Sequence, residues 1–243
     1  MKLEITTGYY QMFNYQESNH SNSFKRQSII IFLAIVTLLT LIPMKLYAEK
    51  YIESEYFIQK VQNNTLPSIE NRIPKKPRLI NLEEPGKYGG EIRMFIGRTK
   101  DIRLMVVYGY SRLVGYNINR DIVPDILEKF EIIDNKKFTF YLRQGHKWSD
   151  GTEFTSEDFR YWWQDVANNE KLSPSGPPND MIQDNETPEF KVIDKYTVQY
   201  EWKKPKTSFL NRLASASPLF IYRPAHYLKQ FHIKYTPEEE IKK

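Results

Sequence analysis

Two segments of alternating side chains, on either side of one amphipathic stretch, limit the folds open to this chain. Residues 137–143 and 197–202 alternate apolar and polar side chains, which is the period of a half-buried strand. A short polar turn precedes each of them, at 134–136 and at 194–195. The sequence therefore predicts two β-hairpins, whose first strands are expected at 130–133 and 190–193.

The stretch between the hairpins is the best helix of the sequence. Thr155 is a suitable N-cap, and acidic residues follow it in the first turn, where they suit the helix dipole. Phe159, Trp162, Trp163 and Val166 then form one apolar stripe at helical spacing. The stripe predicts a core position for Trp162 and leaves both core packing and ligand stacking open for Trp163. Two hairpins around such a helix predict a mixed α/β domain.

The first 48 residues have the character of a leader rather than of a fold. Lys25 and Arg26 precede the uncharged apolar run 29–42, which is long enough for a signal-peptide core and short of the roughly 20 residues that span a bilayer. We expect a cleaved signal peptide over 1–48 and a periplasmic location. Met12 as the true start of translation, and an uncut anchor formed by 29–42, remain as alternatives.

The remainder divides at a cluster of prolines and at a late helix signal. The prolines of residues 49–86 predict an extended, Pro-rich lead-in. It either wraps over a neighbouring surface, the alternative we favour, or simply tethers the domain. Folded structure is expected from Lys87 on, beginning with a strand over 91–96. Thr236 and the Pro and Glu residues after it are a strong helix start, yet the sequence stops before that helix completes two turns. We therefore expect 87–243 to be an incomplete, truncated domain.

Residue types that carry reaction chemistry are sparse. The sequence has no cysteine, which suits the periplasm and removes thiol nucleophiles and cysteine metal sites. Its net charge of +5 is spread along the chain without the basic clusters of nucleic-acid binding proteins. His146, His226 and His232 lack the spacing of a metal set, and no nucleophile elbow or phosphate-binding loop occurs. We expect no enzyme activity, cofactor, metal or nucleic-acid partner.

The most conspicuous local motif is Trp148-Ser149-Asp150-Gly151. Asp-Gly favours a tight turn in which glycine takes a positive φ, and turn chemistry explains every residue of the motif. We therefore interpret Asp150 as a structural residue rather than a catalytic one, with Trp148 packing beside the helix. His226, which closely follows Pro224, is expected to cap or pack at a helix start.

Residues 108–116 combine three tyrosines, two glycines and one arginine. Tyrosine offers a stacking face and a hydroxyl, and arginine can grip a carboxylate through two hydrogen bonds. The candidate ligand-binding residues are Tyr108, Tyr110, Arg112 and Tyr116. An ordinary aromatic helix or loop under the sheet explains the same composition equally well.

These elements, in this order, resemble the family 5 extracellular solute-binding proteins of ATP-binding-cassette (ABC) importers. The most specific similarity is the run 138–158, whose strand, Trp-Ser-Asp-Gly turn and Thr-Ser-Glu-Asp helix start are similar to the family's signature. Residues 89–93 resemble the opening strand, and 122–128 resemble a Pro-Leu-Ala-Glu element with Ile-Leu in place of Leu-Ala. Pro224-Ala225-His226 recurs downstream, so that the resemblance covers 87–232.

The resemblance implies a two-lobed fold that closes over a buried ligand by hinge motion, with this chain supplying the first lobe and lacking the second. It implies a receptor, monomeric when complete, that captures peptides or similar small polar solutes for an inner-membrane ABC permease. Both lobes contact the ligand in such proteins, so the solute is not specified by this sequence. The alternatives are a secreted hydrolase that uses a carboxylate pair, a membrane-anchored interaction module and the inactive product of a disrupted reading frame.

Overall fold

The computed structural model describes residues 51–80, 84, 86–87, 89–91, 93–105 and 111–241, all within one compact unit, Tyr51–Lys243. The leader expected over 1–48 lies outside the described residues. Within these ranges, no helix is both long enough and apolar enough to cross a membrane.

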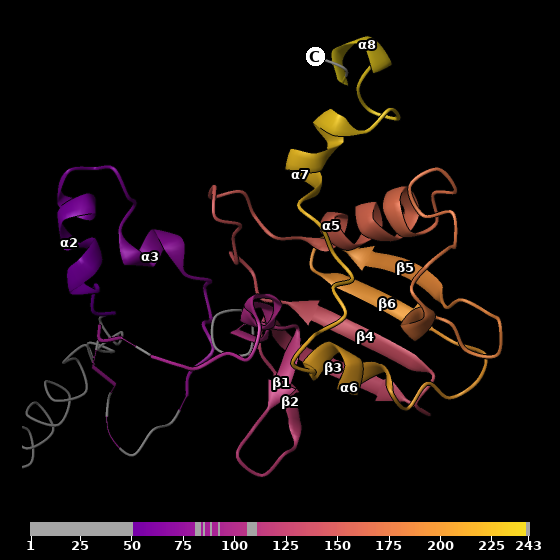
Figure 1. The fold of residues 1–243 in the computed structure, drawn as a ribbon, viewed down its shortest axis with the longest axis horizontal. Helices are drawn as coiled ribbons and strands as arrows, with labels where there is room; N and C mark the ends of the chain where they lie inside the picture. The colour runs from indigo at the N-terminus through magenta and orange to yellow at the C-terminus, as the bar shows by residue number, and fades with distance from the viewer. Residues whose placement is uncertain are drawn as a thin grey trace, which may run out of the picture. The chain divides into compact units, whose positions relative to one another are not determined.

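The described elements are short and mix helices with strands (Figure 1). The helical elements are α2 (Glu55–Gln62), α3 (Ile69–Arg72), η1 (Thr99–Met105), α5 (Ser156–Arg160), η2 (Tyr161–Ala167), η3 (Asn179–Met181), α6 (Phe209–Ala214), α7 (Ala225–Leu228), η4 (Lys229–Phe231) and α8 (Glu238–Ile241). The strands are β1 (Val114–Tyr116), β2 (Ile122–Pro124), β3 (Leu127–Ile133), β4 (Lys137–Leu142), β5 (Glu189–Asp194) and β6 (Thr197–Glu201). The predicted α/β class is confirmed.

Both predicted hairpins are present, and together they form an antiparallel sheet in the order β3-β4-β6-β5. In the first turn, Asp134 and Asn135 have φ values of 51° and 52°, the left-handed conformation that tight hairpin turns require and that Asp and Asn tolerate. In the second turn, the Asp194 carboxylate accepts the N–H of Tyr196 at 2.7 Å. Strands β1 and β2 form a separate hairpin.

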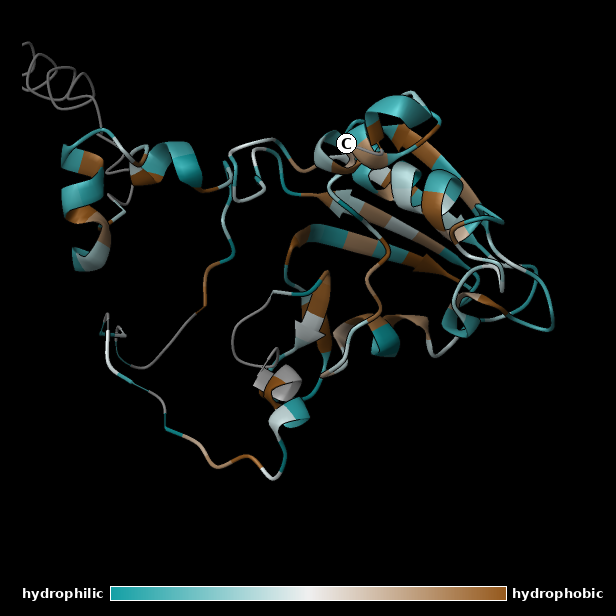
Figure 2. Ribbon diagram, turned by 45° about the horizontal axis from the view of Figure 1, so that its top comes forward, coloured by the Kyte–Doolittle hydropathy of each residue, from teal (hydrophilic) through white to brown (hydrophobic). Residues whose placement is uncertain are grey.

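One face of the four-stranded sheet carries the core. Phe138, Phe140 and Leu142 of β4 are buried on this face, and apolar and polar residues alternate along the strands (Figure 2). Phe209 of α6 closes the core, because its ring lies 5.2 Å from that of Phe138 and 4.7 Å from that of Trp202, both edge to face. This is the arrangement that aromatic rings prefer, and it adds to the stabilisation from burial.

The predicted amphipathic helix covers the same face through α5 and η2. Phe159, Trp162 and Trp163 are all buried, and the Trp163 ring meets the Tyr200 ring edge to face at 6.0 Å. Trp163 therefore belongs to the core. The second half of the helix, η2, is a wider π-helix, which the apolar stripe does not predict because its spacing is that of an α-helix. The widened turn buries Asp165 as well as the two tryptophans.

A capping box begins α5, with Thr155 as the N-cap that the sequence predicts. Thr155 Oγ1 accepts the N–H of Glu157 at 3.3 Å, and the Asp158 carboxylate accepts the N–H of Thr155 at 2.9 Å. The other oxygen of Asp158 accepts the N–H of Ala225 at 3.0 Å, 67 residues further along the chain. Asp158 is 3% exposed, and this burial raises the pKa of its carboxyl in spite of the hydrogen bonds. One buried carboxylate thus joins the first turns of α5 and α7.

The lead-in is partly helical, which corrects the prediction of an extended segment over 49–86. Helices α2 and α3 both lie within it. The prolines flank α3 rather than interrupt it, since Pro67 precedes it and Pro74 follows it. Proline is compatible with helix ends, so the prolines of this segment do not exclude short helices between them.

The later part of the lead-in wraps over the end of β4. The N–H of Lys75 donates to the carbonyl of Gln144 at 3.0 Å. The Arg143 guanidinium donates to the carbonyl of Lys76 at 2.8 Å. The wrapping that we favoured is therefore present, although the side chain of Leu79 is 68% exposed.

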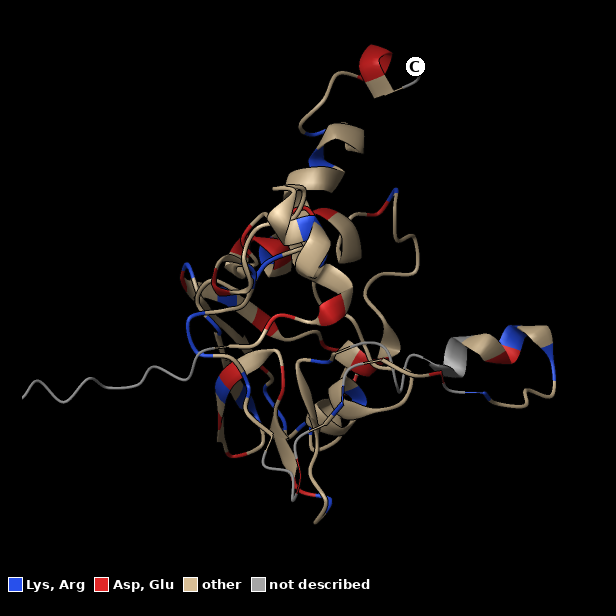
Figure 3. Cartoon of the chain, turned by 90° about the vertical axis from the view of Figure 1, so that its left-hand side faces the viewer, with Lys and Arg blue, Asp and Glu red and all other residues tan. Residues whose placement is uncertain are grey.

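The predicted strand over 91–96 is wrong for the residues that the structure describes there. Met94, Phe95 and Ile96 belong to no strand, and all three side chains are exposed. An alternating pattern becomes a strand only where a neighbour supplies the hydrogen-bonding ladder, and no such neighbour is present among the described residues. The helix predicted near the C-terminus is present as α8, whose acidic first turn is red in Figure 3.

We expect Asp158→Asn to destabilise the protein by about 2 kcal/mol. The amide keeps the shape of the carboxylate, but its NH2 group would face one of the two backbone donors, from Thr155 or Ala225. Urea unfolding followed by tryptophan fluorescence measures the difference. The matched control is Asp184→Asn at an exposed ion pair with Lys204, for which no measurable change is expected. Equal stability of the two variants would contradict the role of Asp158.

Candidate functional site

Two of the four predicted ligand-binding residues lie in the described part of the chain. Arg112 stands two residues before β1, and Tyr116 is its last residue. Tyr108 and Tyr110 lie outside the described residues. No observation on the molecule tests their role, so all four remain predicted ligand contacts.

Arg112 and Tyr116 both reach α6 and the loop after it. Arg112 Nε donates to the carbonyl of Ser215 at 2.9 Å, which fixes the plane of the guanidinium. Tyr116 Oη donates to Asn211 Oδ1 at 3.0 Å, while 48% of the residue remains exposed. The backbone N–H of Arg112 is held by the Asp125 carboxylate at 3.0 Å. The pair therefore combines an oriented cation with an accessible aromatic ring beside one helix.

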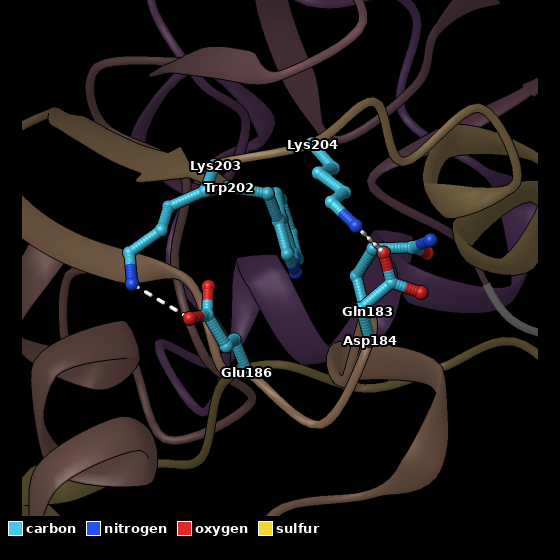
Figure 4. A pocket seen from close by; sticks show the side chains of 6 residues that line it. All are labelled: Gln183, Asp184, Glu186, Trp202, Lys203 and Lys204. Carbon is cyan, nitrogen blue, oxygen red and sulfur yellow. Dashed lines mark hydrogen bonds and ion pairs between the residues drawn. The ribbon is translucent and has the colours of Figure 1, made fainter.

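Neither residue lines any of three cavities among the described residues. One cavity, of about 170 Å³, is lined by Gln183, Asp184, Glu186, Trp202, Lys203 and Lys204 (Figure 4). Its charges pair with one another, Lys203 with Glu186 at 2.7 Å and Lys204 with Asp184 at 2.8 Å. The indole of Trp202 stands between the two pairs and donates to the carbonyl of Met181 at 2.9 Å. With these groups satisfied and little volume, it is unsuited to an organic ligand.

A wider cavity of about 470 Å³ lies where β4 meets β6. Tyr141 contributes to its wall, but Lys129 Nζ lies 3.9 Å from the centroid of that ring and covers it. The Tyr141 hydroxyl donates to Glu131 at 2.9 Å, and this hydrogen bond raises the pKa of the phenol. A third cavity, of about 410 Å³, lies between the lead-in and the Trp148–Gly151 turn.

The motifs that carry the family resemblance meet in one place. Asp150 Oδ1 accepts the N–H of Thr152 at 2.9 Å, and Gly151 has a φ of 89°, as a tight turn requires. Asp150 Oδ2 lies 2.6 Å from His226 Nε2 at the start of α7. The hydrogen bonds from Thr152 and then from His226 lower the pKa of the Asp150 carboxyl. This geometry agrees with the structural interpretation of Asp150 and with His226 packing at a helix start.

Trp148 supports the same junction. Its ring lies 5.5 Å from Phe154, 6.1 Å from Tyr222 and 6.4 Å from His226. It therefore packs beside the start of α5, as predicted. Across the described ranges, no group of three or more histidine and acidic residues could hold a metal ion.

The structure adds a buried carboxylate that the sequence analysis missed. Asp165 of η2 has a side chain 2% exposed, and it accepts hydrogen bonds from Lys234 Nζ at 2.5 Å and Tyr235 Oη at 2.5 Å. Arg160 Nη1 donates to it at 2.9 Å. Burial alone would raise the pKa of the Asp165 carboxyl, but the three donors outweigh burial and lower it. The cluster attaches the segment after α7 to the helix. No local sequence pattern predicts the Asp165 cluster, because two of the partners of Asp165 are about 70 residues away in the sequence.

Comparison with known proteins decides the family. Residues 121–240 match the model of the bacterial extracellular solute-binding proteins, family 5 (middle part). The chain belongs to family 5 of these solute-binding proteins. Family 5 members are binding proteins rather than enzymes.

Relatives within family 5 bind different solutes. The periplasmic α-galactoside-binding protein of Rhizobium meliloti is 27% identical over 77% of this chain and 30% of its own length. The periplasmic murein peptide-binding protein MppA of Escherichia coli is 32% identical over 44% of this chain and 22% of its own length. The solved structure of an oligopeptide-binding protein OppA is 33% identical, with a TM-score of 0.68 over 79% of this chain and 30% of its own. The chain thus spans less than a third of the length of these relatives.

We expect Lys234→Met to move the acid limb of the stability profile to higher pH. A carboxyl whose pKa is lowered by folding adds stability above its unfolded pKa of about 4 and loses it as the pH falls through the folded value. Removing one of the three donors to Asp165 brings its folded pKa closer to the unfolded one. The loss still begins near the unfolded pKa, but it is smaller and is complete at a higher pH, and the stability near neutrality is lower.

The midpoints of urea unfolding, measured between about pH 2 and pH 7, report this change in the pH dependence of stability. Lys203→Met, which removes the exposed ion pair with Glu186, is the control. Coincident profiles for Lys234→Met and the unaltered protein would contradict the coupling.

Proposed function

We propose that this protein is the solute-binding component of an ABC importer and captures peptides or similar small polar solutes. The observation that carries the proposal is the likeness to an oligopeptide-binding protein, which combines 33% identity with a TM-score of 0.68. The proposal includes delivery of the solute to an inner-membrane permease. Within the receptor, residues 87–243 act as the first of two lobes that close over the ligand.

Peptides are the preferred ligand class because two kinds of relative point to them. MppA is named for murein peptides and OppA for oligopeptides. On this chain, Arg112 would bind the carboxylate of a peptide, since its guanidinium plane is already fixed by Ser215. The exposed ring of Tyr116 would contact a peptide side chain, and Tyr108 and Tyr110 would extend the same wall.

Peptide binding is tested by isothermal titration calorimetry of the full chain with trialanine and, in parallel, with raffinose as an α-galactoside. We expect trialanine to bind and raffinose not to displace it. Arg112→Gln should weaken peptide binding by about tenfold, the size of one charge-assisted hydrogen bond. Arg93→Gln, at a side chain that is 89% exposed, should leave it unchanged.

Binding of raffinose without trialanine would overturn the peptide assignment and favour a saccharide receptor. Equal affinities of Arg112→Gln and Arg93→Gln would remove Arg112 from the ligand contacts.

We also propose that the protein is periplasmic after removal of residues 1–48. Relatives such as MppA are named as periplasmic proteins, and the leader pattern of this sequence supports export. The intact mass of protein released from the periplasm by osmotic shock should match a chain that begins at Glu49. A protein that keeps residues 1–48 and stays with the membrane after a carbonate wash would favour the anchored alternative.

A further inference from the structure

The cavity between the lead-in and the Trp148–Gly151 turn has walls that are built by long-range contacts. Its volume of about 410 Å³ lies in the range of small-ligand sites. Lys147 Nζ donates to the carbonyl of Asn71 and so ties the turn to the lead-in. Arg72 Nε donates to the carbonyl of Pro67 at 2.9 Å, and its guanidinium pairs with Glu53. Both walls are therefore held in place without a ligand.

One wall offers an aromatic surface. Trp148 is half-buried, because Phe154 and Tyr222 pack against its ring, and it is one of the residues that line the cavity. An indole supported from behind is a rigid apolar platform. The axial C–H groups of a sugar ring match such a platform, because they form one apolar face on an otherwise polar molecule.

The polar groups around this platform suit hydroxyl groups. Lys147 supplies ammonium hydrogens and Asp150 supplies carboxylate lone pairs, while Asn71, Ser149 and Thr65 add an amide and two hydroxyls. The residues that line the cavity therefore include both donors and acceptors. A sugar hydroxyl is donor and acceptor at once and can use both kinds.

The charges favour a neutral ligand. The cation of Arg72 is matched by Glu53, and the remaining formal charges, Lys147 and Asp150, are of opposite sign. A carboxylate ligand would gain from Lys147 and lose to Asp150, and an amine would do the reverse. A neutral polyhydroxylated ring meets neither penalty.

We propose that this cavity is a binding site for a neutral mono- or disaccharide. It is separate from the Arg112–Tyr116 contacts proposed for peptide, shares no residue with them, and does not depend on the peptide assignment.

The test is saturation-transfer difference NMR of the full chain with lactose, followed by calorimetric titration. Lactose should receive saturation, strongest at the protons of one ring face. Trialanine should not compete with it. Lys147→Gln should weaken lactose binding by about tenfold through the loss of a charged donor, whereas Lys203→Gln at the 170 Å³ cavity should leave it unchanged.

Trp148→Phe provides a second variant that keeps an aromatic ring against Phe154 and Tyr222. It should retain the native unfolding midpoint to within a few degrees and weaken lactose binding, because the platform shrinks. Absence of saturation transfer to lactose, or lactose affinity unchanged in both Lys147→Gln and Trp148→Phe, would overturn the proposal. Competition by trialanine would show one shared site and would overturn it as well.

Discussion

The Asp158 carboxylate accepts one backbone N–H from its own helix turn and another from Ala225, 67 residues later. Because its two oxygens serve two segments, the start of α5 and the start of α7 cannot move independently. That junction also places Trp148 against His226 and Asp150 within reach of the same histidine. The family motifs are therefore neighbours in space, although they are well separated in the sequence. Their shared role is to assemble the junction on which the cavity walls and the core face are built.

A second buried carboxylate, Asp165 of η2, also joins segments that are far apart in the sequence. It accepts hydrogen bonds from Arg160, Lys234 and Tyr235. Two of these donors lie after α7, so this segment is attached to the helix at Lys234 and Tyr235 as well as at Ala225. The two acids respond to folding in opposite ways. Burial dominates at Asp158 and raises its pKa, whereas three donors dominate at Asp165 and lower it. Desolvation raises the pKa of both carboxyls, and the number of charged donors decides whether the net pKa shift is upward or downward.

Elements specified by local chemistry could be predicted from the sequence. The hairpin turn at Asp134 and Asn135 and the cap at Thr155 depend on residues a few positions apart, and both were found where expected. The strand expected over 91–96 failed because a strand is defined by its neighbour and not by its own pattern. The Asp165 cluster could not be foreseen, since its partners come together only through the path of the chain. Of the predicted ligand residues, Arg112 and Tyr116 were brought together beside α6, which sequence alone did not indicate.

The attachment of the lead-in has a consequence for how this protein can evolve. Arg143 and Lys147 bind carbonyl groups of Lys76 and Asn71, and the N–H of Lys75 binds a carbonyl in turn. Each contact uses the main chain of the lead-in rather than one of its side chains. Substitutions in that part of the lead-in therefore preserve these main-chain contacts, and at Lys76 and Arg78 they remove only the ion pairs with Glu128 and Asp125. A change at Arg143 or Lys147, in contrast, removes a main-chain contact outright. Homologues can accordingly diverge in the lead-in while still folding it onto the same surface, so sequence similarity there should fade faster than structural similarity.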